Sequence, residues 1–236
     1  MKKIFIPIIV TLSLVFFTLS CKSDDGISYE LSKVDQAVLS TQMNNFIKTN
    51  FNQFKVKEVS QILPSYLTMK SLTDIEFFDE IEETGETFEE NAQLKAQTIF
   101  EKTGKNIFAD DSGLVIEALN GAPGVYSARF AGTGKDEDNI AKVLKELDGK
   151  TNRKAYFISV FCLILNGEKH FFEGKINGTI STEILGENGF GYDPIFIPDG
   201  FSKSFAQMSA DEKNAISHRA KAVEKLNIFL TNLNEN

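Results

Sequence analysis

The stretch Ile107-Phe108-Ala109-Asp110-Asp111-Ser112-Gly113 carries a short apolar run that ends in two adjacent carboxylates. The run is typical of a strand, and side chains alternate along a strand, so Asp110 and Asp111 are expected to point to opposite faces. One carboxylate can then be structural while the other meets a ligand. A carboxylate at a strand end suits Mg²⁺, which takes oxygen ligands and shares substrate phosphates. Taken alone, such a stretch is more often a solvated acidic turn.

A helix is predicted immediately before this strand. Thr87-Phe88-Glu89-Glu90 is a capping-box pattern, and Gly104 is a residue type that ends helices. Asn91 and Lys95 lie four residues apart and therefore share one face of the helix. From there Lys95 can reach a phosphate oxygen as a point charge, although a surface role is the usual one for a lysine. Glu90 can add a metal contact, although most acidic runs are solvated faces.

The segments after the carboxylates alternate between helical and strand patterns. The apolar spacing predicts an amphipathic helix over 136–148. Strands are predicted over 156–165 and 169–180, and Asn166-Gly167 between them is a strong signal for a two-residue hairpin turn. Strands and helices interspersed in this way predict an α/β protein with a mixed sheet.

A glycine-rich hexad, Gly189-Phe190-Gly191-Tyr192-Asp193-Pro194, follows the second of these strands. Glycines let the backbone approach a ligand closely. Phe190 or Tyr192 can supply a plane on which a base stacks, and Asp193 or backbone amides can read a base edge. The alternative is a tight turn with buried aromatic rings. A short strand is predicted directly after the hexad, at 195–197.

A second capping box, Ser209-Ala210-Asp211-Glu212, predicts one helix that runs past Ile216 to about Leu230. This helix carries Lys213 and the adjacent pair His218-Arg219. An arginine can stack on a base or donate to an acceptor with two N–H groups, and a histidine can donate to a purine carbonyl. A lone histidine is more often structural, but its place beside an arginine and near a lysine favours ligand binding.

The first 21 residues have a character of their own. Lys2 and Lys3 precede an apolar run over 4–19, which is too short to span a bilayer comfortably, and Cys21 follows it. A basic start, an apolar stretch and a small residue describe a secretory signal, and the cysteine makes it look like a bacterial lipoprotein signal. A buried N-terminal strand is the alternative. Helical spacing further along predicts a helix over 34–49.

Length and composition bound the class of protein. The chain has 236 residues, enough for one large or two-lobed domain, and a net charge of −8. Binding to nucleic acid is therefore not expected, because it needs clustered lysine and arginine. Cys162 lies in an apolar run and is expected to be a buried free thiol. The two cysteines, Cys21 and Cys162, indicate neither a disulfide framework nor a zinc site.

The motifs in combination resemble the inosine/xanthosine triphosphate diphosphatase family, over roughly residues 52–230. The matching stretches are Glu83-Thr84-Gly85, Thr87-Phe88, Glu90-Asn91-Ala92, Lys95-Ala96, 109–114, 121–130, 189–194 and 212–219. No single stretch is decisive, but their order and combination are highly specific.

The resemblance implies an elongated, two-lobed α/β fold with a mixed sheet and a central substrate cleft, usually in a homodimer. It implies Mg²⁺-dependent hydrolysis of ITP, dITP or XTP to the monophosphate and pyrophosphate. Asp111 matches the metal-binding residue and proton acceptor, and Glu90 is a further candidate metal contact. The predicted substrate-binding residues are Asn52, Lys55, Lys95, Ser112, Phe190, Gly191, Tyr192, Asp193, Lys213, His218 and Arg219.

The N-terminal part departs from the family's pattern, because the phosphate loop keeps only its later half, at 52–58, and has one extra residue before it. The predicted division is a lipoprotein-like signal at 1–21, a linker or atypical segment at 22–49 and the pyrophosphatase domain at 50–236. The family implies a cytoplasmic protein, and a lipid anchor on Cys21 is the alternative. Two other functions stay open: a catalytically impaired, lipid-anchored binding protein, and a Maf-like pyrophosphatase acting on modified pyrimidine nucleotides.

Overall fold

The computed structural model describes residues 81–233, Phe77, and the backbone of four short strands. These strands are β1 (Phe5–Ile8), β2 (Val15–Thr18), β3 (Phe46–Lys48) and β4 (Met69–Ser71). The predictions made for Cys21, Asn52 and Lys55 lie outside the described residues, as does most of the predicted signal and linker.

A six-stranded mixed sheet is the centre of the fold, with strand order β4-β3-β5-β6-β7-β8. Its long strands are β5 (Ile107–Ile116), β6 (Lys154–Leu165) and β7 (Glu168–Ile180), and β8 (Phe196–Pro198) closes one edge. β3 runs parallel to both β4 and β5, whereas the pairs from β5 to β8 are antiparallel. The predicted mixed sheet is confirmed.

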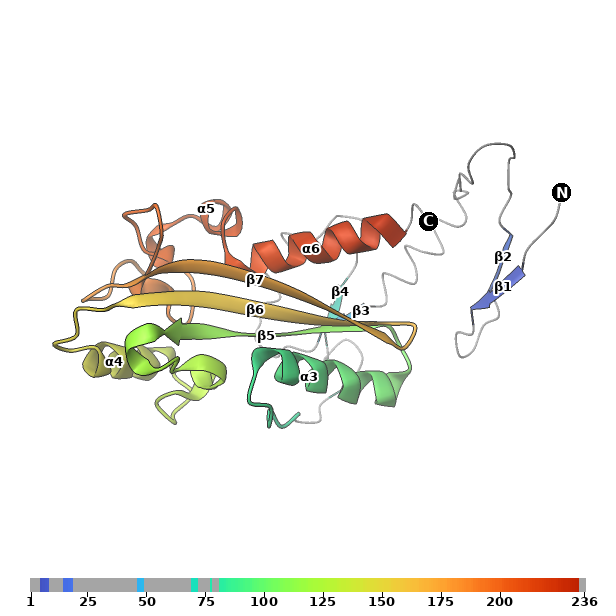
Figure 1. Cartoon of the computed structure of the whole chain (residues 1–236), viewed down its shortest axis with the longest axis horizontal. Helices are drawn as coiled ribbons and strands as arrows, with labels where there is room; N and C mark the ends of the chain where they lie inside the picture. Colours follow the sequence, from blue (N-terminus) through green and yellow to red (C-terminus); the bar gives the residue numbers. More distant parts are fainter. Residues whose placement is uncertain are drawn as a thin grey trace.

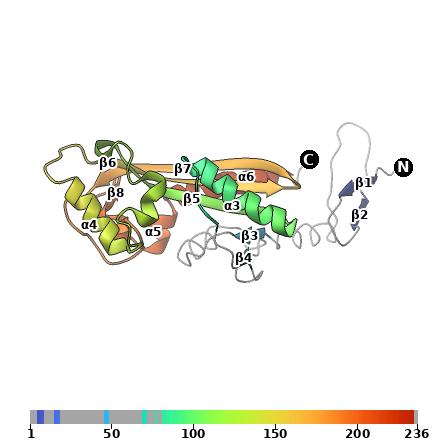
Figure 2. The same ribbon diagram turned by 90° about the horizontal axis from the view of Figure 1, so that it is seen from below.

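The helices cover both faces of this elongated sheet (Figure 1). α3 (Phe88–Thr103) packs on one face and α6 (His218–Leu233) on the other. α4 (Asp136–Glu146) and α5 (Ala210–Asn214) lie toward the far end of the sheet, as Figure 2 also shows. The short 3-10 turns are η2 (Glu117–Leu119), η3 (Gly124–Arg129), η4 (Asp193–Ile195) and η5 (Phe205–Gln207).

Successive side chains of a strand point to opposite faces of the sheet, and this divides the core into layers. Ala109 and Cys162 join the apolar cluster beneath α3, whereas Phe108 and Phe161 join the cluster beneath α6. A third cluster fills the end of the sheet near α4 and β8. Consecutive residues of β5 therefore reach different sides of the molecule, which decides where its two carboxylates point.

Local sequence signals account for several element boundaries. Thr87 and Ser209 form the two predicted capping boxes, and Gly104 ends α3 in the left-handed conformation at φ 63°. Asn166 and Gly167 both have positive φ, as the two-residue turn between β6 and β7 requires. These features confirm the predicted helix start, helix end and hairpin.

Three predicted elements were wrong in part. Residues 46–48 form β3 rather than the end of a helix over 34–49, because two neighbouring strands take up their backbone hydrogen bonds. β5 extends to Ile116, so the two carboxylates lie within a strand and not at its end. The C-terminal helix is interrupted between Asn214 and His218, and α6 starts at His218.

Candidate active site

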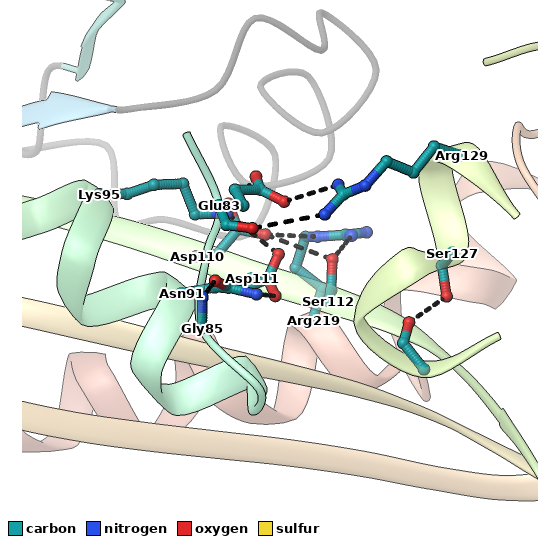
Figure 3. Close-up of polar contacts among 11 residues, drawn as sticks. Glu83, Gly85, Asn91, Lys95, Asp110, Asp111, Ser112, Ser127, Arg129 and Arg219 are labelled. Atoms are coloured by element: carbon teal, nitrogen blue, oxygen red, sulfur yellow. Dashed lines mark hydrogen bonds and ion pairs between the residues drawn. The ribbon is translucent and has the colours of Figure 1, made fainter. Parts of the chain in front are cut away.

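Asp111 lies on the α3 face of β5, where α3 supplies two of its partners. The Lys95 ammonium is 3.0 Å from Asp111 Oδ1, and Asn91 Nδ2 donates to Asp111 Oδ2 over 3.4 Å. Lys95 also donates to Glu83 Oε1 over 3.1 Å. The predicted shared face of Asn91 and Lys95 is thus the face that meets Asp111 (Figure 3).

The charge on Lys95 is stabilised by this cluster although the side chain is buried. Burial alone would lower the pKa of Lys95, but the carboxylates of Asp111, Glu83 and Asp110 raise it above its ordinary value. Lys95 is therefore a permanent cation at neutral pH. The cluster holds a positive charge between the buried carboxylate of Asp111 and the partly exposed carboxylate of Glu83.

Asp110 lies on the other face of β5, as its position next to Asp111 predicted. Arg219 Nε is 3.9 Å from Asp110 Oδ2, and one terminal nitrogen of Arg219 donates to Ser112 Oγ over 3.0 Å. Ser112 Oγ is 3.5 Å from the same Asp110 oxygen. Arg219 and Asp110 are both fully buried, so this guanidinium is held in place by charge and hydrogen bonding.

The hexad turn is organised around Asp193. Its Oδ2 atom accepts from Lys213 Nζ over 2.6 Å and from the Phe190 N–H over 2.9 Å. Asp193 is buried and already accepts from two donors, which leaves its carboxylate less able to bind the edge of a base as predicted. The Lys213 ammonium in turn lies 4.8 Å from the centroid of the Phe190 ring.

The two aromatic rings of the hexad have different surroundings. Tyr192 is 4% exposed, belongs to the apolar core, and donates its hydroxyl to the Ser127 carbonyl over 2.8 Å. Phe190 is only half-buried, and Arg219 lies 5.7 Å from its centroid. Of the two rings predicted as stacking planes, Phe190 is therefore the less buried one.

A pocket lies between Ser112, Arg219 and the hexad turn, whereas Asp111 and Lys95 are not among the residues that line it. His218 stands in its wall with its ring stacked 4.8 Å from that of Phe157. The predicted residues that line the pocket are Ser112, Phe190, Gly191, Tyr192, Asp193, Lys213, His218 and Arg219. Predicted site residues from three distant parts of the chain thus meet around one cavity.

Sequence reasoning placed less weight on four residues that the structure brings to the site. Ser127 and Asp136 line the pocket, and Glu83 and Asn91 contact the Lys95–Asp111 cluster. Glu83 and Asn91 belong to stretches that resemble the diphosphatase family, so the sequence contained a signal for their place at the site. Ser127 stood in a recognised motif too, whereas Asp136 read only as the start of an amphipathic helix.

Glu90 lies apart from this cluster and has a local role. Its Oε2 atom accepts from the N–H groups of Glu86 and Thr87, which completes the capping box of α3. Glu83, by contrast, shares Lys95 with Asp111. The metal contact predicted for Glu90 remains a prediction.

The donor set around Asp111 suits a hard cation. All the acidic groups there offer oxygen, and Mg²⁺ needs only one or two carboxylates when substrate phosphates and water complete its shell. Within residues 81–233, no three acidic, histidine or cysteine side chains form a metal cage by themselves. The residues present therefore fit a cation shared with a phosphorylated ligand.

Fold and site together define an α/β protein with a small-molecule pocket next to a carboxylate–ammonium cluster. A model of the Ham1 family matches residues 47–229. The chain belongs to the Ham1 family.

Two relatives named dITP/XTP pyrophosphatase are close in sequence. The one from Flavobacterium psychrophilum is 48% identical over 182 residues, which cover 77% of this chain and 96% of that protein. The one from Bacillus subtilis is 49% identical over 193 residues, covering 80% and 98%. The solved structure of the Staphylococcus aureus Ham1 protein superimposes with a TM-score of 0.73 at 41% identity, covering 79% of this chain and 98% of that one.

Proposed function

We propose that this chain hydrolyses the non-standard purine nucleoside triphosphates ITP, dITP and XTP to the monophosphate and pyrophosphate. One observation carries the proposal. Asp111 faces Lys95 and Glu83 on one side of β5, while the next residue, Ser112, binds Arg219 in the pocket on the other side. A polar cluster suited to phosphates and a pocket suited to a base are thus one residue apart. The names and coverage of the relatives support the same activity.

The base end of the pocket can discriminate between purines. His218 and Arg219 are hydrogen-bond donors, and Phe190 offers a stacking plane. A purine with a 6-oxo group presents an acceptor to these donors, whereas adenine presents an amino donor at that position. A site built from donors rejects such a mismatch because its buried polar groups would stay unpaired.

The phosphate end supplies the chemistry of hydrolysis. Asp111 is the proposed proton acceptor for the attacking water, and Lys95 is a fixed cation for the phosphates. The reaction breaks the anhydride bond between the α- and β-phosphates, so that the water oxygen ends on one of the two products. Asp111 and Glu83 are the residues we propose to hold Mg²⁺, which when bound neutralises phosphate charge. Asn52 and Lys55 remain proposed phosphate contacts.

The proposal extends to partners and place. We expect a homodimer, as the resemblance implies, and a cytoplasmic protein, because its substrates are cytoplasmic nucleotides. Among the described residues, none of the helices is both long and apolar enough to cross a membrane. Fatty-acid labelling in a bacterial host tests the alternative, since an anchored chain would carry label on Cys21.

The test of function is pyrophosphate release by the full-length chain from ITP, XTP, dITP and ATP, with and without Mg²⁺. We expect Mg²⁺-dependent release from the first three, well above ATP. Equal turnover of ATP, or orthophosphate as the first product, would contradict the proposal. Absence of turnover with every purine would favour the impaired binding protein, and turnover confined to modified pyrimidine nucleotides would favour the Maf-like alternative.

A further inference from the structure

The hexad turn is anchored by side chains on its inner side, which faces Asp193, but on the opposite, outer side no side chain of the described residues packs against it at Gly191. On the inner side, Asp193 Oδ2 binds both the Phe190 N–H and Lys213. On the outer side, Gly191 has φ 60°, and no other part of the described chain lies within 4 Å of where its Cβ would be. Packing therefore does not fix the outer half of the turn.

One hydrogen bond crosses to this outer half from a different part of the molecule. Asp136 Oδ2 accepts the Gly191 N–H over 2.6 Å, between residues 55 apart in the chain. A carboxylate that accepts from a backbone N–H at this length makes a strong, charge-assisted bond. Asp136 is the first residue of α4 and lines the same pocket as Phe190.

Hydrogen bonds of Asn139 hold the start of α4, and with it Asp136, in place. Asn139, one turn further along α4, accepts from the Ala131 N–H over 2.7 Å and donates to the Ala128 carbonyl over 3.2 Å. These bonds tie α4 to η3 and to Ala131 just after it, and η3 also receives the Tyr192 hydroxyl at the Ser127 carbonyl. The η3–α4 unit thus holds the hexad turn at two successive residues, 191 and 192, and Asp136 is the exposed one of the two contacts.

We propose that Asp136 is a positioning residue, which fixes the plane of the Phe190 ring by holding Gly191 and thereby sets the affinity for the purine base. This rests on the proposed function. Ring stacking acts on bound substrate and transition state alike, so its loss raises KM while kcat is largely kept. A general loss of folded protein would instead lower the apparent kcat and leave KM alone.

The chain offers matched variants for a test. Asp136→Ala removes the acceptor, whereas Asp136→Asn keeps an oxygen that can accept from the Gly191 N–H. Glu137→Ala is the control, because it removes an exposed acid from the same first turn of α4. We expect Asp136→Ala to raise KM for ITP about tenfold, as for loss of one charge-assisted hydrogen bond. Asp136→Asn keeps a weaker, neutral hydrogen bond and should fall clearly between the unmodified chain and Asp136→Ala, at a rise of about threefold, whereas Glu137→Ala should stay within about twofold of the unmodified chain on the same scale.

A double-mutant cycle with Phe190→Leu then asks whether Asp136 acts through the ring. We expect Asp136→Ala to add little to the KM of Phe190→Leu, since the ring it positions is already gone. A full tenfold rise in that background, or an Asp136→Asn variant as weak as Asp136→Ala, would overturn the proposal. Turnover of ITP by the unmodified chain is measured first. Its absence would count against the proposed function, whereas the variants judge the role of Asp136.

Discussion

At the scale of single residues, the buried Asp111 carboxylate is the group on which turnover should depend most. Asp111→Asn keeps the shape of the side chain, and Lys95 keeps Glu83 as its second partner. We therefore expect the variant to fold and to lose about two to four decades of kcat, as for removal of a general base. Pyrophosphate release, with circular dichroism as the folding control, measures both. An active variant would move the role of proton acceptor to Asp110 or Glu83.

The buried thiol of Cys162 makes a prediction about pH. Burial, partly offset by Lys169 and reinforced by Glu89, raises the pKa of Cys162 to about 12. Below the unfolded-state pKa, near 9, the thiol is protonated in both states and its contribution to stability is complete. Between about pH 9 and 12 the unfolded chain loses the proton first, so the free energy of unfolding falls as pH rises.

A comparison of urea unfolding at pH 8 and pH 10.5 checks this prediction. The unmodified chain should lose more stability over that interval than Cys162→Ala, which has no thiol to ionise. Other alkaline groups, including Lys95 and Tyr192, titrate in both proteins, so the difference isolates Cys162. Parallel losses in the two proteins would mean that water reaches the thiol in the folded state.

At the scale of elements, the contact between α6 and β7 is unusually close. A Cβ placed on Gly174 would lie 2.0 Å from the His218 carbonyl oxygen and 2.5 Å from the Ala222 nitrogen. Gly174→Ala must therefore displace the first turn of α6, which carries His218 and Arg219. An ångström of displacement can cost about a hundredfold in rate. We expect the preference for ITP over ATP, as a ratio of kcat/KM, to fall at least about tenfold, within that range.

Gly178→Ala is the matched control for this variant. It adds the same methyl group to the same strand, but against the Ile197 carbonyl of β8, at 2.3 Å. Both variants overpack the sheet and should lose about 1–3 kcal/mol of stability. Only Gly174→Ala should lose selectivity. An equal loss in both would show that the preference depends on the sheet as a whole and not on the position of α6.

Elements with strong local signals could be predicted from the sequence, and those set by long-range contacts could not. The capping boxes at Thr87 and Ser209 and the Asn166-Gly167 turn depend on neighbouring residues, and they formed where predicted. β3 depends on pairing with distant strands, and its residues looked helical by spacing. The break before His218 does coincide with a local feature, because Ser217 Oγ accepts the Ala220 N–H over 3.1 Å and so caps the first turn of α6.

The site shows the same division. Residue types and spacing identified the groups that line the pocket, because their chemistry is rare in combination. The sequence did not indicate which acidic residue contacts which partner. Glu83 and Glu90 belong to one acidic run, but Glu83 binds Lys95 whereas Glu90 caps α3. The place of Asp136 depends on a contact across 55 residues, which periodicity cannot reveal.

At the scale of the whole molecule, the family match begins at residue 47, within β3, whose pairing with the sheet starts at Phe46. We expect a chain that starts at residue 46 to keep kcat/KM for ITP and the midpoint of thermal unfolding close to those of the full-length chain. The physical reason is that the described contacts of the site all lie between residues 83 and 219. A marked drop in either quantity would show that the first 45 residues brace the fold.

The β6–β7 hairpin has a consequence for how the molecule assembles. Its two strands pair residue by residue from Leu165 and Glu168 at the two-residue turn out to Lys154 and Thr179, so each pair can form next to one that is already closed. Forming such a hairpin costs little loop-closure entropy and takes microseconds. The contacts of β5, the hexad turn and α6 with the hairpin join residues far apart in the chain and therefore form more slowly. A refolding chain should therefore regain its strand signal in circular dichroism before it can release pyrophosphate, and nascent chains should hold a finished hairpin while the catalytic parts are still unassembled.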